Sequence, residues 1–213
     1  MIKLSLRLKT IFSLLDRAAV FADIGCDHGY IAYAMLESGK CEKAIVTDVS
    51  AACLKKAEDL LAEDFAGRYE AIVADGFRGV PRADEALIAG MGGELIAKII
   101  EEADYLPAVL VVQPMKNPEK ARLALLKAGY RITRDYTFED GKFYELIRAE
   151  RGEDEYTERE LVFGRDNLKE KGEAFVKAIN KKKKKLVGAI NSMNDAEREK
   201  TLAEISVLEE IIK

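Results

Sequence analysis

The chain has 213 residues, of which 48% are hydrophobic and 34% are charged. This balance is typical of a globular protein, excludes a largely disordered chain, and suits one domain with a small appendage. A net charge of −4 and a pI near 5.4 argue against indiscriminate binding to nucleic acid but leave room for a local basic patch.

Three cysteines, Cys26, Cys41 and Cys53, form no Cys-x-x-Cys pair. Scattered thiols of this kind predict a reduced intracellular protein without a disulfide framework or a metal site. Residues 1–9 alternate charged residues with leucine and contain no apolar signal region, and the longest strongly apolar stretch, 108–112, is too short to cross a bilayer. We therefore expect a soluble cytoplasmic protein that uses neither a membrane nor a metal.

Short apolar runs alternate with helix-favouring stretches over most of the chain. The runs are continuously apolar, which is typical of buried parallel strands, and they lie at 19–24, 44–48, 70–74, 86–90 and 108–113. Helices are expected over 30–37, over 51–63 with Ser50 as N-cap, over 93–103, and from Asn117-Pro118, an N-cap with proline at N1, to Gly129. Repeated strand–helix units predict a doubly wound α/β sheet with right-handed crossovers.

Two further strands, 130–138 and 142–149, are joined by Asp140-Gly141, a strong hairpin signal. The last strand must therefore run antiparallel to its partner. Five or six parallel strands closed by one antiparallel strand resemble the sheet of class I methyltransferases. A generic Rossmann-like sheet with an edge hairpin fits this pattern almost as well.

The loop after the first strand, residues 21–29, lies where an open α/β sheet binds its ligand. Gly25 and Gly29 allow a tight turn and a close backbone approach, but they do not follow the spacing of a dinucleotide fingerprint. Asp23 and Asp27 would repel a pyrophosphate, whereas they suit the amino group and the sulfonium of S-adenosylmethionine.

Acidic residues also end the next two strands. Asp48 lies where a carboxylate accepts ribose hydroxyls, and Asp75-Gly76 lies beside the expected adenine position. One acidic strand end is common, but three in register favour a cofactor site. The predicted cofactor-binding residues are Asp23, Gly25, Asp27, His28, Gly29, Tyr30, Asp48, Val49, Asp75, Gly76 and Gly90.

The fourth strand leads into residues 88–94, Ile-Ala-Gly-Met-Gly-Gly-Glu. This segment lacks the Asp/Asn-Pro-Pro-aromatic motif with which many methyltransferases hold an exocyclic amine. Gly90, Gly92 and Gly93 predict a bare backbone that a flat acceptor can approach, since a tight turn alone would account for only one or two of them. Gln113 ends the fifth strand and either hydrogen-bonds a base edge or satisfies loop backbone groups.

A composition shift after Arg151 predicts two units, a sheet domain over 1–152 and a helical hairpin over 153–213. Residues 157–160 form a capping box, and 192–195 turn the chain. Helical spacing predicts one apolar seam on each side of this turn, formed by Phe175, Ile179, Lys182, Leu186, Ile190 and Met193 and by Leu202, Ile205, Leu208 and Ile212.

A run of five lysines, Lys181, Lys182, Lys183, Lys184 and Lys185, covers every face of one helical turn in this hairpin. Such a run is usually a solvated surface, but on an appendage to an acidic domain a contact with phosphates is about equally expected. Arg7, Lys9 and Arg17 near the N-terminus would extend a track for RNA.

Several motifs together resemble the bacterial tRNA adenine-22 N1-methyltransferase family. They are residues 4–8, Leu-Ser-Leu-Arg-Leu; 23–28, Asp-Ile-Gly-Cys-Asp-His; 88–93; Gln113-Pro114; and 141–145, Gly-Lys-Phe-Tyr-Glu. The match runs in order along nearly the whole chain and includes Phe163-Gly164 and the helical hairpin. The resemblance implies a class I fold, S-adenosylmethionine as donor and the D-loop adenine of tRNA as acceptor. Departures are Met115, where the family usually has asparagine, and residues 29–32.

Methylation at adenine N1 needs no base, because N1 carries a free lone pair at neutral pH. A carboxylate or a row of carbonyls would stabilise the cationic product, and an aromatic or methionine face, such as Tyr30, Met91 or Tyr144, would stack the displaced base. His28, the only histidine, either positions Asp27 or transfers a proton. The candidate catalytic residues are Asp27, His28, Gly90, Met91, Gly92, Gly93 and Gln113.

Two other classes of protein remain open at this stage. One is a small-molecule methyltransferase whose hairpin is a lid or a dimer contact, and the other is a non-catalytic RNA-binding protein that has kept the fold. For each of these functions we expect a monomer or a weak dimer.

Overall fold

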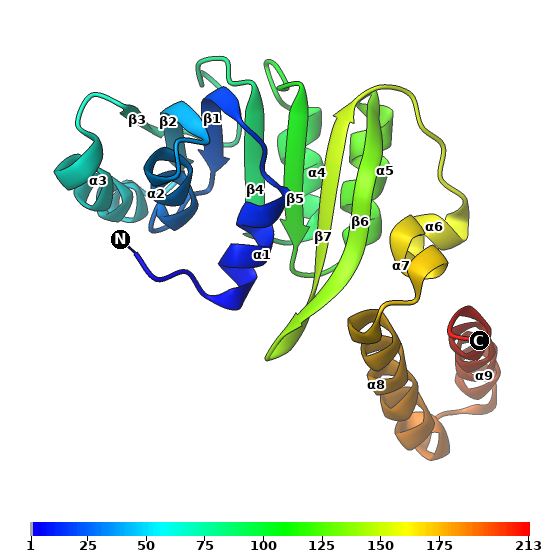
Figure 1. Cartoon of the computed structure of the whole chain (residues 1–213). Coiled ribbons are helices and arrows are strands. Elements are labelled where there is room, and N and C mark those ends of the chain that lie inside the picture. Colours follow the sequence, from blue (N-terminus) through cyan, green and yellow to red (C-terminus); the bar gives the residue numbers. More distant parts are fainter. Residues whose placement is uncertain (1) are drawn as a thin grey trace.

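The computed structural model describes residues 2–213, which form a seven-stranded sheet with helices on both faces and a helical hairpin beyond one edge (Figure 1). The strand order is β3-β2-β1-β4-β5-β7-β6. The strands are β1 (Ala18–Ile24), β2 (Cys41–Asp48), β3 (Tyr69–Val73), β4 (Glu85–Met91), β5 (Val109–Pro114), β6 (Tyr130–Asp140) and β7 (Lys142–Arg151). The doubly wound α/β prediction is confirmed, and every predicted strand is present. The predicted and observed strand bounds differ most at the start of β2, which was expected at residue 44 and begins at Cys41.

The last two strands lie in an order that the sequence did not predict. The sequence predicts one antiparallel strand but gives no order for the last two strands. Antiparallel β7 lies between β5 and β6, so the edge strand β6 runs parallel to β5. The tight turn at Gly141, with φ +66°, folds β7 back against β6, and its buried Leu146, Ile147 and Ala149 then fill the space beside β5. The hairpin and the antiparallel direction of β7 are confirmed.

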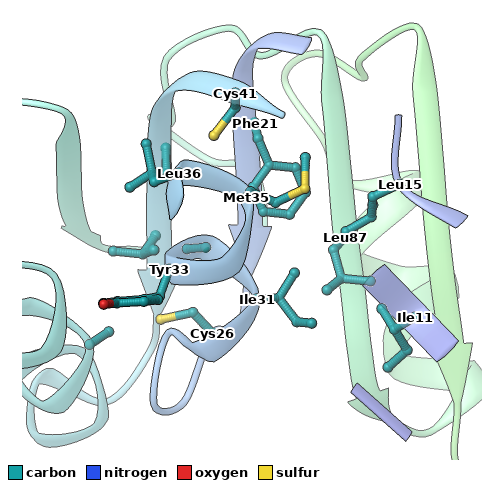
Figure 2. Packing of buried hydrophobic residues seen from close by; sticks show 14 of the residues in the cluster. Ile11, Leu15, Phe21, Cys26, Ile31, Tyr33, Met35, Leu36, Cys41 and Leu87 are labelled. Carbon is teal, nitrogen blue, oxygen red and sulfur yellow. The ribbon is translucent and has the colours of Figure 1, made fainter. Parts of the chain in front are cut away.

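Helices cover the two faces of the sheet in separate groups. One face packs against α1 (Leu6–Leu14), α2 (Tyr30–Glu37) and α3 (Ala51–Phe65), and the other against α4 (Gly93–Glu101) and α5 (Pro118–Lys127). Successive strand residues point to opposite faces, so Phe21 faces the first group and Ala22 the second. Figure 2 shows Ile11, Leu15 and Leu87 packed on the first face.

Helix α1 is an element that the sequence reasoning missed. The alternation of leucine with charge over the first residues conceals a helix whose N-cap is Ser5, the side chain of which accepts from the N–H of Leu8. Ile11 is fully buried and Leu15 is 1% exposed, so the helix is held by the sheet and not by a strong apolar stripe of its own. This docking brings the N-terminal segment to the carboxyl ends of the strands.

The C-terminal part begins with two short helices that pack on the edge of the sheet. They are α6 (Glu158–Phe163), which starts with the predicted capping box at Thr157, and α7 (Arg165–Glu170). The fully buried Arg122 of α5 donates to the carbonyl of Leu161 at 2.9 Å and pairs with Asp135 of β6 at 2.8 Å. Residues 157–170 are thus fastened to the sheet domain by hydrogen bonds and ion pairs.

The chain ends in an antiparallel hairpin of α8 (Glu173–Ala189), a short 3-10 turn (Ile190–Ser192) and α9 (Asp195–Ile211), which projects beyond the β6 edge (Figure 1). Phe175 and Ile179 of α8 pack with Leu208 and Ile211 of α9 near α7. The predicted return face is wrong at Leu202, which is 52% exposed. Thr201 is buried in its place, because the stripe that meets α8 lies one residue earlier at the far end of the hairpin.

Candidate cofactor and acceptor site

A cavity of about 640 Å³ opens at the carboxyl ends of β1, β2, β3 and β4. Its size lies within the range of small-molecule sites. The cofactor candidates that line it are Asp23, Gly25, Asp27, His28, Tyr30, Asp48, Val49, Asp75, Gly76 and Gly90. Gly29 is the exception: it caps α2 with φ +69°, and a Cβ there would lie 2.8 Å from the Cβ of Ala57. Its role is to let α2 approach α3.

Asp23 is the most strongly perturbed carboxyl group in the cavity wall. It lies near the end of β1 and is only 5% exposed. Burial raises its pKa from 3.8 to about 7, and the nearby charge of Asp48 acts in the same direction, while the N–H of Ala32 opposes the shift. Among the described residues Asp23 has no cationic partner. A buried carboxyl group that faces a cavity in this way is typical of a site whose ligand supplies the cation.

The loop after β1 is held in a strained, compact form. Gly25 has φ +73°, and a Cβ there would lie 2.0 Å from Cε of Met91. Asp27 has φ +49°, its N–H donates to Oδ2 of Asp48 at 3.3 Å, and its carboxylate contacts Nδ1 of His28 at 2.7 Å. His28 therefore has the geometry of a residue that positions Asp27, and its ring stacks on Tyr30 at 5.4 Å.

Asp48 lies in the cavity wall and also orders the loops around it. Its Oδ1 accepts from the N–H of Ser50 at 2.8 Å, and Ser50 in turn caps α3 as predicted. The N–H groups of Gly25 and Cys26 both donate to the carbonyl of Thr47 at 2.8 Å. The first two strand ends are thereby tied together, which holds the predicted ribose and sulfonium positions side by side.

The glycine-rich segment after β4 divides into two parts. Gly90, with φ +80°, and Met91 line the cavity. Gly92 and Gly93 do not, and a Cβ on Gly93 would lie 1.9 Å from the carbonyl oxygen of Asn117. Close packing of α4 against the β5–α5 loop thus requires Gly93. Of the three glycines that the sequence assigned to a bare acceptor surface, only Gly90 lines the cavity, together with Met91.

The polar residues after β5 also serve that loop. Gln113 is fully buried and lies outside the cavity wall; its Nε2 donates to the carbonyl of Pro114 at 3.0 Å, and its Oε1 has no hydrogen-bond partner among the described residues. Asn117 is the N-cap residue of α5 and Pro118 is at N1, both as predicted, but the side chain of Asn117 makes no cap hydrogen bond. Asn117 is left-handed at φ +49°, and its side chain bonds to Glu94.

Several cavity residues escaped the sequence reasoning. Ser5, Arg7 and Leu8 come from α1 and its cap, and Leu95 and Ile99 come from α4. The apolar members carry no signal that separates them from core residues. Arg7 was predicted to belong to an RNA-binding track, whereas its side chain lies in the cavity wall. Tyr144 stacks on Phe138 at 5.4 Å and lies outside that wall.

The lysine run divides into paired and unpaired members. Lys182 pairs with Glu204 at 2.8 Å and Lys183 with Glu209 at 3.4 Å, both across the hairpin. Lys181 lies 5.6 Å from the ring centre of Phe143 at the tip of β7. Lys184 and Lys185 are exposed, and no described residue pairs with either.

Residues 2–213 contain no cluster of metal-ligating side chains, and none of their helices is long and apolar enough to span a membrane. The three cysteines are free thiols.

Comparison with known proteins matches this arrangement to one family. Residues 21–213 match the family described as tRNA (adenine(22)-N(1))-methyltransferase. The Bacillus subtilis protein of that name is 34% identical over 160 residues, which cover 71% of this chain and 67% of the relative. A crystal structure of the B. subtilis enzyme shares 26% identity, covers 100% of both chains and superposes with a TM-score of 0.87.

A Streptococcus pneumoniae structure in complex with S-adenosyl-L-methionine is 27% identical, with a TM-score of 0.90 over 99% of this chain and 100% of that chain. These matches confirm the resemblance drawn from the motifs, including the class I fold, and they favour neither the small-molecule enzyme nor the non-catalytic protein. The chain belongs to the tRNA (adenine(22)-N(1))-methyltransferase family.

Proposed function

We propose that this protein transfers a methyl group from S-adenosylmethionine to N1 of adenine 22 in tRNA, in the cytoplasm. The observation that carries the proposal is the cavity at the strand ends, in which the buried carboxyl group of Asp23 faces carboxylates on β2 and after β3. Family membership identifies the acceptor, and the complex of the S. pneumoniae relative supports the donor.

The residues of the cavity fit the proposed donor. In this proposal Asp23 binds a cationic amino group, Asp48 accepts from ribose hydroxyls and Asp75-Gly76 borders the adenine. All of these residues line the cavity. Gly25, with φ +73°, has no side chain, so its backbone can lie close to a ligand in the cavity. When bound, S-adenosylmethionine supplies an electrophilic methyl group on a cationic sulfonium.

The protein's own contribution to the chemistry is placement and electrostatics. Adenine N1 attacks with its lone pair, and the positive charge then passes from the sulfonium to the base, so no proton has to leave first. Asp27 lies in the cavity wall and is held by His28 at 2.7 Å, where its negative charge stabilises a nearby cation. Tyr30, 42% exposed at the cavity, offers a ring on which the displaced base can stack.

The hairpin supplies the contact with RNA outside the cavity. Lys184 and Lys185 are free to meet phosphates, whereas Lys182 and Lys183 are engaged by glutamates of α9. Fastening of α6 and α7 to the sheet through Arg122 holds the base of this hairpin at a fixed place relative to the catalytic cavity.

The test is methylation of tRNA with S-adenosylmethionine labelled in the methyl group. We expect label in 1-methyladenosine at position 22 of an A22 tRNA and none in the same tRNA with guanosine at that position. Label found only in small molecules would point to the small-molecule alternative. Binding of tRNA without any transfer would point to the non-catalytic one.

A further inference from the structure

Three aromatic side chains follow one another on the β6–β7 hairpin, on the side of the sheet that carries α1. The ring centres of Tyr144 and Phe138 lie 5.4 Å apart in a stacked pair, and those of Phe138 and Tyr136 lie 6.5 Å apart. Phe138 is paired with Tyr144 across the two strands, and Tyr136 lies two residues before Phe138, so all three share one face. We call these three residues the aromatic row.

The two tyrosines of the aromatic row reach solvent. Phe138 is 8% exposed, whereas Tyr136 and Tyr144 are only partly buried. Neither tyrosine hydroxyl has a hydrogen-bond partner among the described residues, and neither oxygen is buried. The hydroxyls of the core residues Tyr33 and Tyr130, in contrast, are bonded within the protein, as is usual for buried tyrosines. In the described part of the chain no helix lies in front of β6 on this side (Figure 1).

The hairpin that carries the aromatic row touches both the catalytic cavity and the lysine run. The guanidinium carbon of Arg7, a residue of the cavity wall, lies 5.7 Å from the ring centre of Tyr144. Near the tip of the same hairpin, Lys181 of α8 lies 5.6 Å from the ring centre of Phe143. An RNA that enters the cavity and also contacts α8 therefore crosses this hairpin.

Cations stand at both ends of the aromatic row. Arg7 lies beside Tyr144, and the guanidinium carbon of Arg134 lies 5.3 Å from the ring centre of Tyr136. The side chain of Arg134 is 43% exposed although it pairs with two carboxylates of α7. Rings in series with cations beside them are typical of sites for unpaired RNA, in which bases stack on aromatic side chains and cations contact phosphates.

We propose that the aromatic row is a stacking surface for the nucleotides next to adenine 22 of the bound tRNA. This inference rests on the proposed function and concerns the acceptor outside the cavity. Adenine 22 has to leave its stack to enter the cavity, and its departure uncovers the faces of the neighbouring bases. Tyr144 and Tyr136 replace the lost contact with rings of their own, which lowers the cost of displacing the base.

The test combines substitutions in the protein with removal of single bases from the tRNA. The protein variants are Tyr136→Leu, Tyr144→Leu, Tyr136→Phe and Tyr144→Phe, with Tyr69→Leu as the matched control. Tyr69 is also partly buried and lies on the same face of the sheet, but it belongs to β3 at the opposite edge. The tRNA variants carry one abasic residue, immediately before or immediately after adenine 22.

Dissociation constants for tRNA are measured over a range of salt concentrations, and those for S-adenosylmethionine by calorimetry. We expect each leucine variant to bind intact tRNA about fivefold to a hundredfold more weakly, the loss typical of one base–aromatic stack. The slope of log affinity against log salt should not change, because no charge is removed. Affinity for S-adenosylmethionine should match wild type, because neither ring lines the cavity.

The phenylalanine variants should bind tRNA almost as wild type does, since they keep the ring, and Tyr69→Leu should match wild type. At least one abasic tRNA should bind wild type about as weakly as intact tRNA binds a leucine variant. Combining that abasic tRNA with the leucine variant should cost little more than either change alone, because both remove the same stack.

Wild-type protein that binds both abasic tRNAs as tightly as intact tRNA would overturn the proposal, whatever the protein variants do. Fully additive losses at both abasic positions would also overturn it, as would equal losses in the phenylalanine and leucine variants. In each of these cases the proposed function stands as long as wild type methylates adenine 22. A wild-type protein that transfers no methyl group to this tRNA would instead refute the proposed function itself.

Discussion

Replacement of Asp23 by asparagine should stabilise the free protein and weaken cofactor binding. In the wild-type protein, stability should fall and cofactor affinity should rise as pH increases toward 7. Asp23 is 5% exposed, and burial raises its pKa from 3.8 to about 7. Between these values the unfolded chain has lost the proton that the folded protein still holds. Stability of the free protein therefore falls as pH rises from about 4 to about 7 and is level above that range.

The magnitude follows from the width of that window. A pKa raised from 3.8 to about 7 corresponds to about 4 kcal/mol at about 1.4 kcal/mol per pH unit. The asparagine of Asp23→Asn does not titrate, so the advantage of this variant over wild type should grow by about 2–3 kcal/mol between pH 5 and pH 7. Glu85, 2% exposed with a pKa also raised to about 7, titrates in both proteins and cancels in the difference.

Urea unfolding of both proteins at pH 5, 6, 7 and 8 without ligand measures this difference. Calorimetry with S-adenosylmethionine at the same pH values should show wild-type affinity rising toward pH 7 and levelling, because the cationic ligand requires the ionised carboxylate. The Asp23→Asn variant should bind S-adenosylmethionine weakly, and its affinity should lack the part of the pH dependence that Asp23 causes in wild type. A stability difference that does not change with pH, or normal cofactor affinity in Asp23→Asn, would refute the reasoning.

Three further outcomes are expected. Gly93→Ala should lower the free energy of unfolding by about 1–3 kcal/mol, because its Cβ would collide with the backbone of Asn117, while Gly92→Ala should cost much less; equal losses in urea titrations would contradict this packing. Replacement of Lys184 and Lys185 by Gln should weaken tRNA binding and flatten the slope of log affinity against log salt by about 0.7 to 0.9 for each phosphate that the variant no longer neutralises; an unchanged slope would make them ordinary surface. Arg122→Met should cost about 3–5 kcal/mol of stability, since it strands the buried carboxylate of Asp135; a loss below about 1 kcal/mol by the same measurement would rule out the bracing role of this pair.

Local patterns account for much of the site because parallel strands bring their carboxyl ends to one edge. Asp23, Asp48 and Asp75 lie far apart in the chain, yet each lies at or next to the end of an apolar run, and the fold places all three in one wall. The same argument fails for Gln113, which also ends a strand. Its side chain turns into the loop and is fully buried, and no periodicity distinguishes that rotamer from an exposed one.

The α/β class, the hairpin at Gly141, the helical C-terminus and the acidic strand ends could all be predicted from the sequence, because each depends on hydrophobic periodicity or turn chemistry within a short window. The place of β7 inside the sheet and the docking of α1 at the cavity could not. These features depend on contacts between distant segments, as in the bond from the N–H of Arg7 to Asp140 across 133 positions. Such contacts depend on how side chains from two distant segments fit together in space. A short stretch of sequence from either segment does not contain that information.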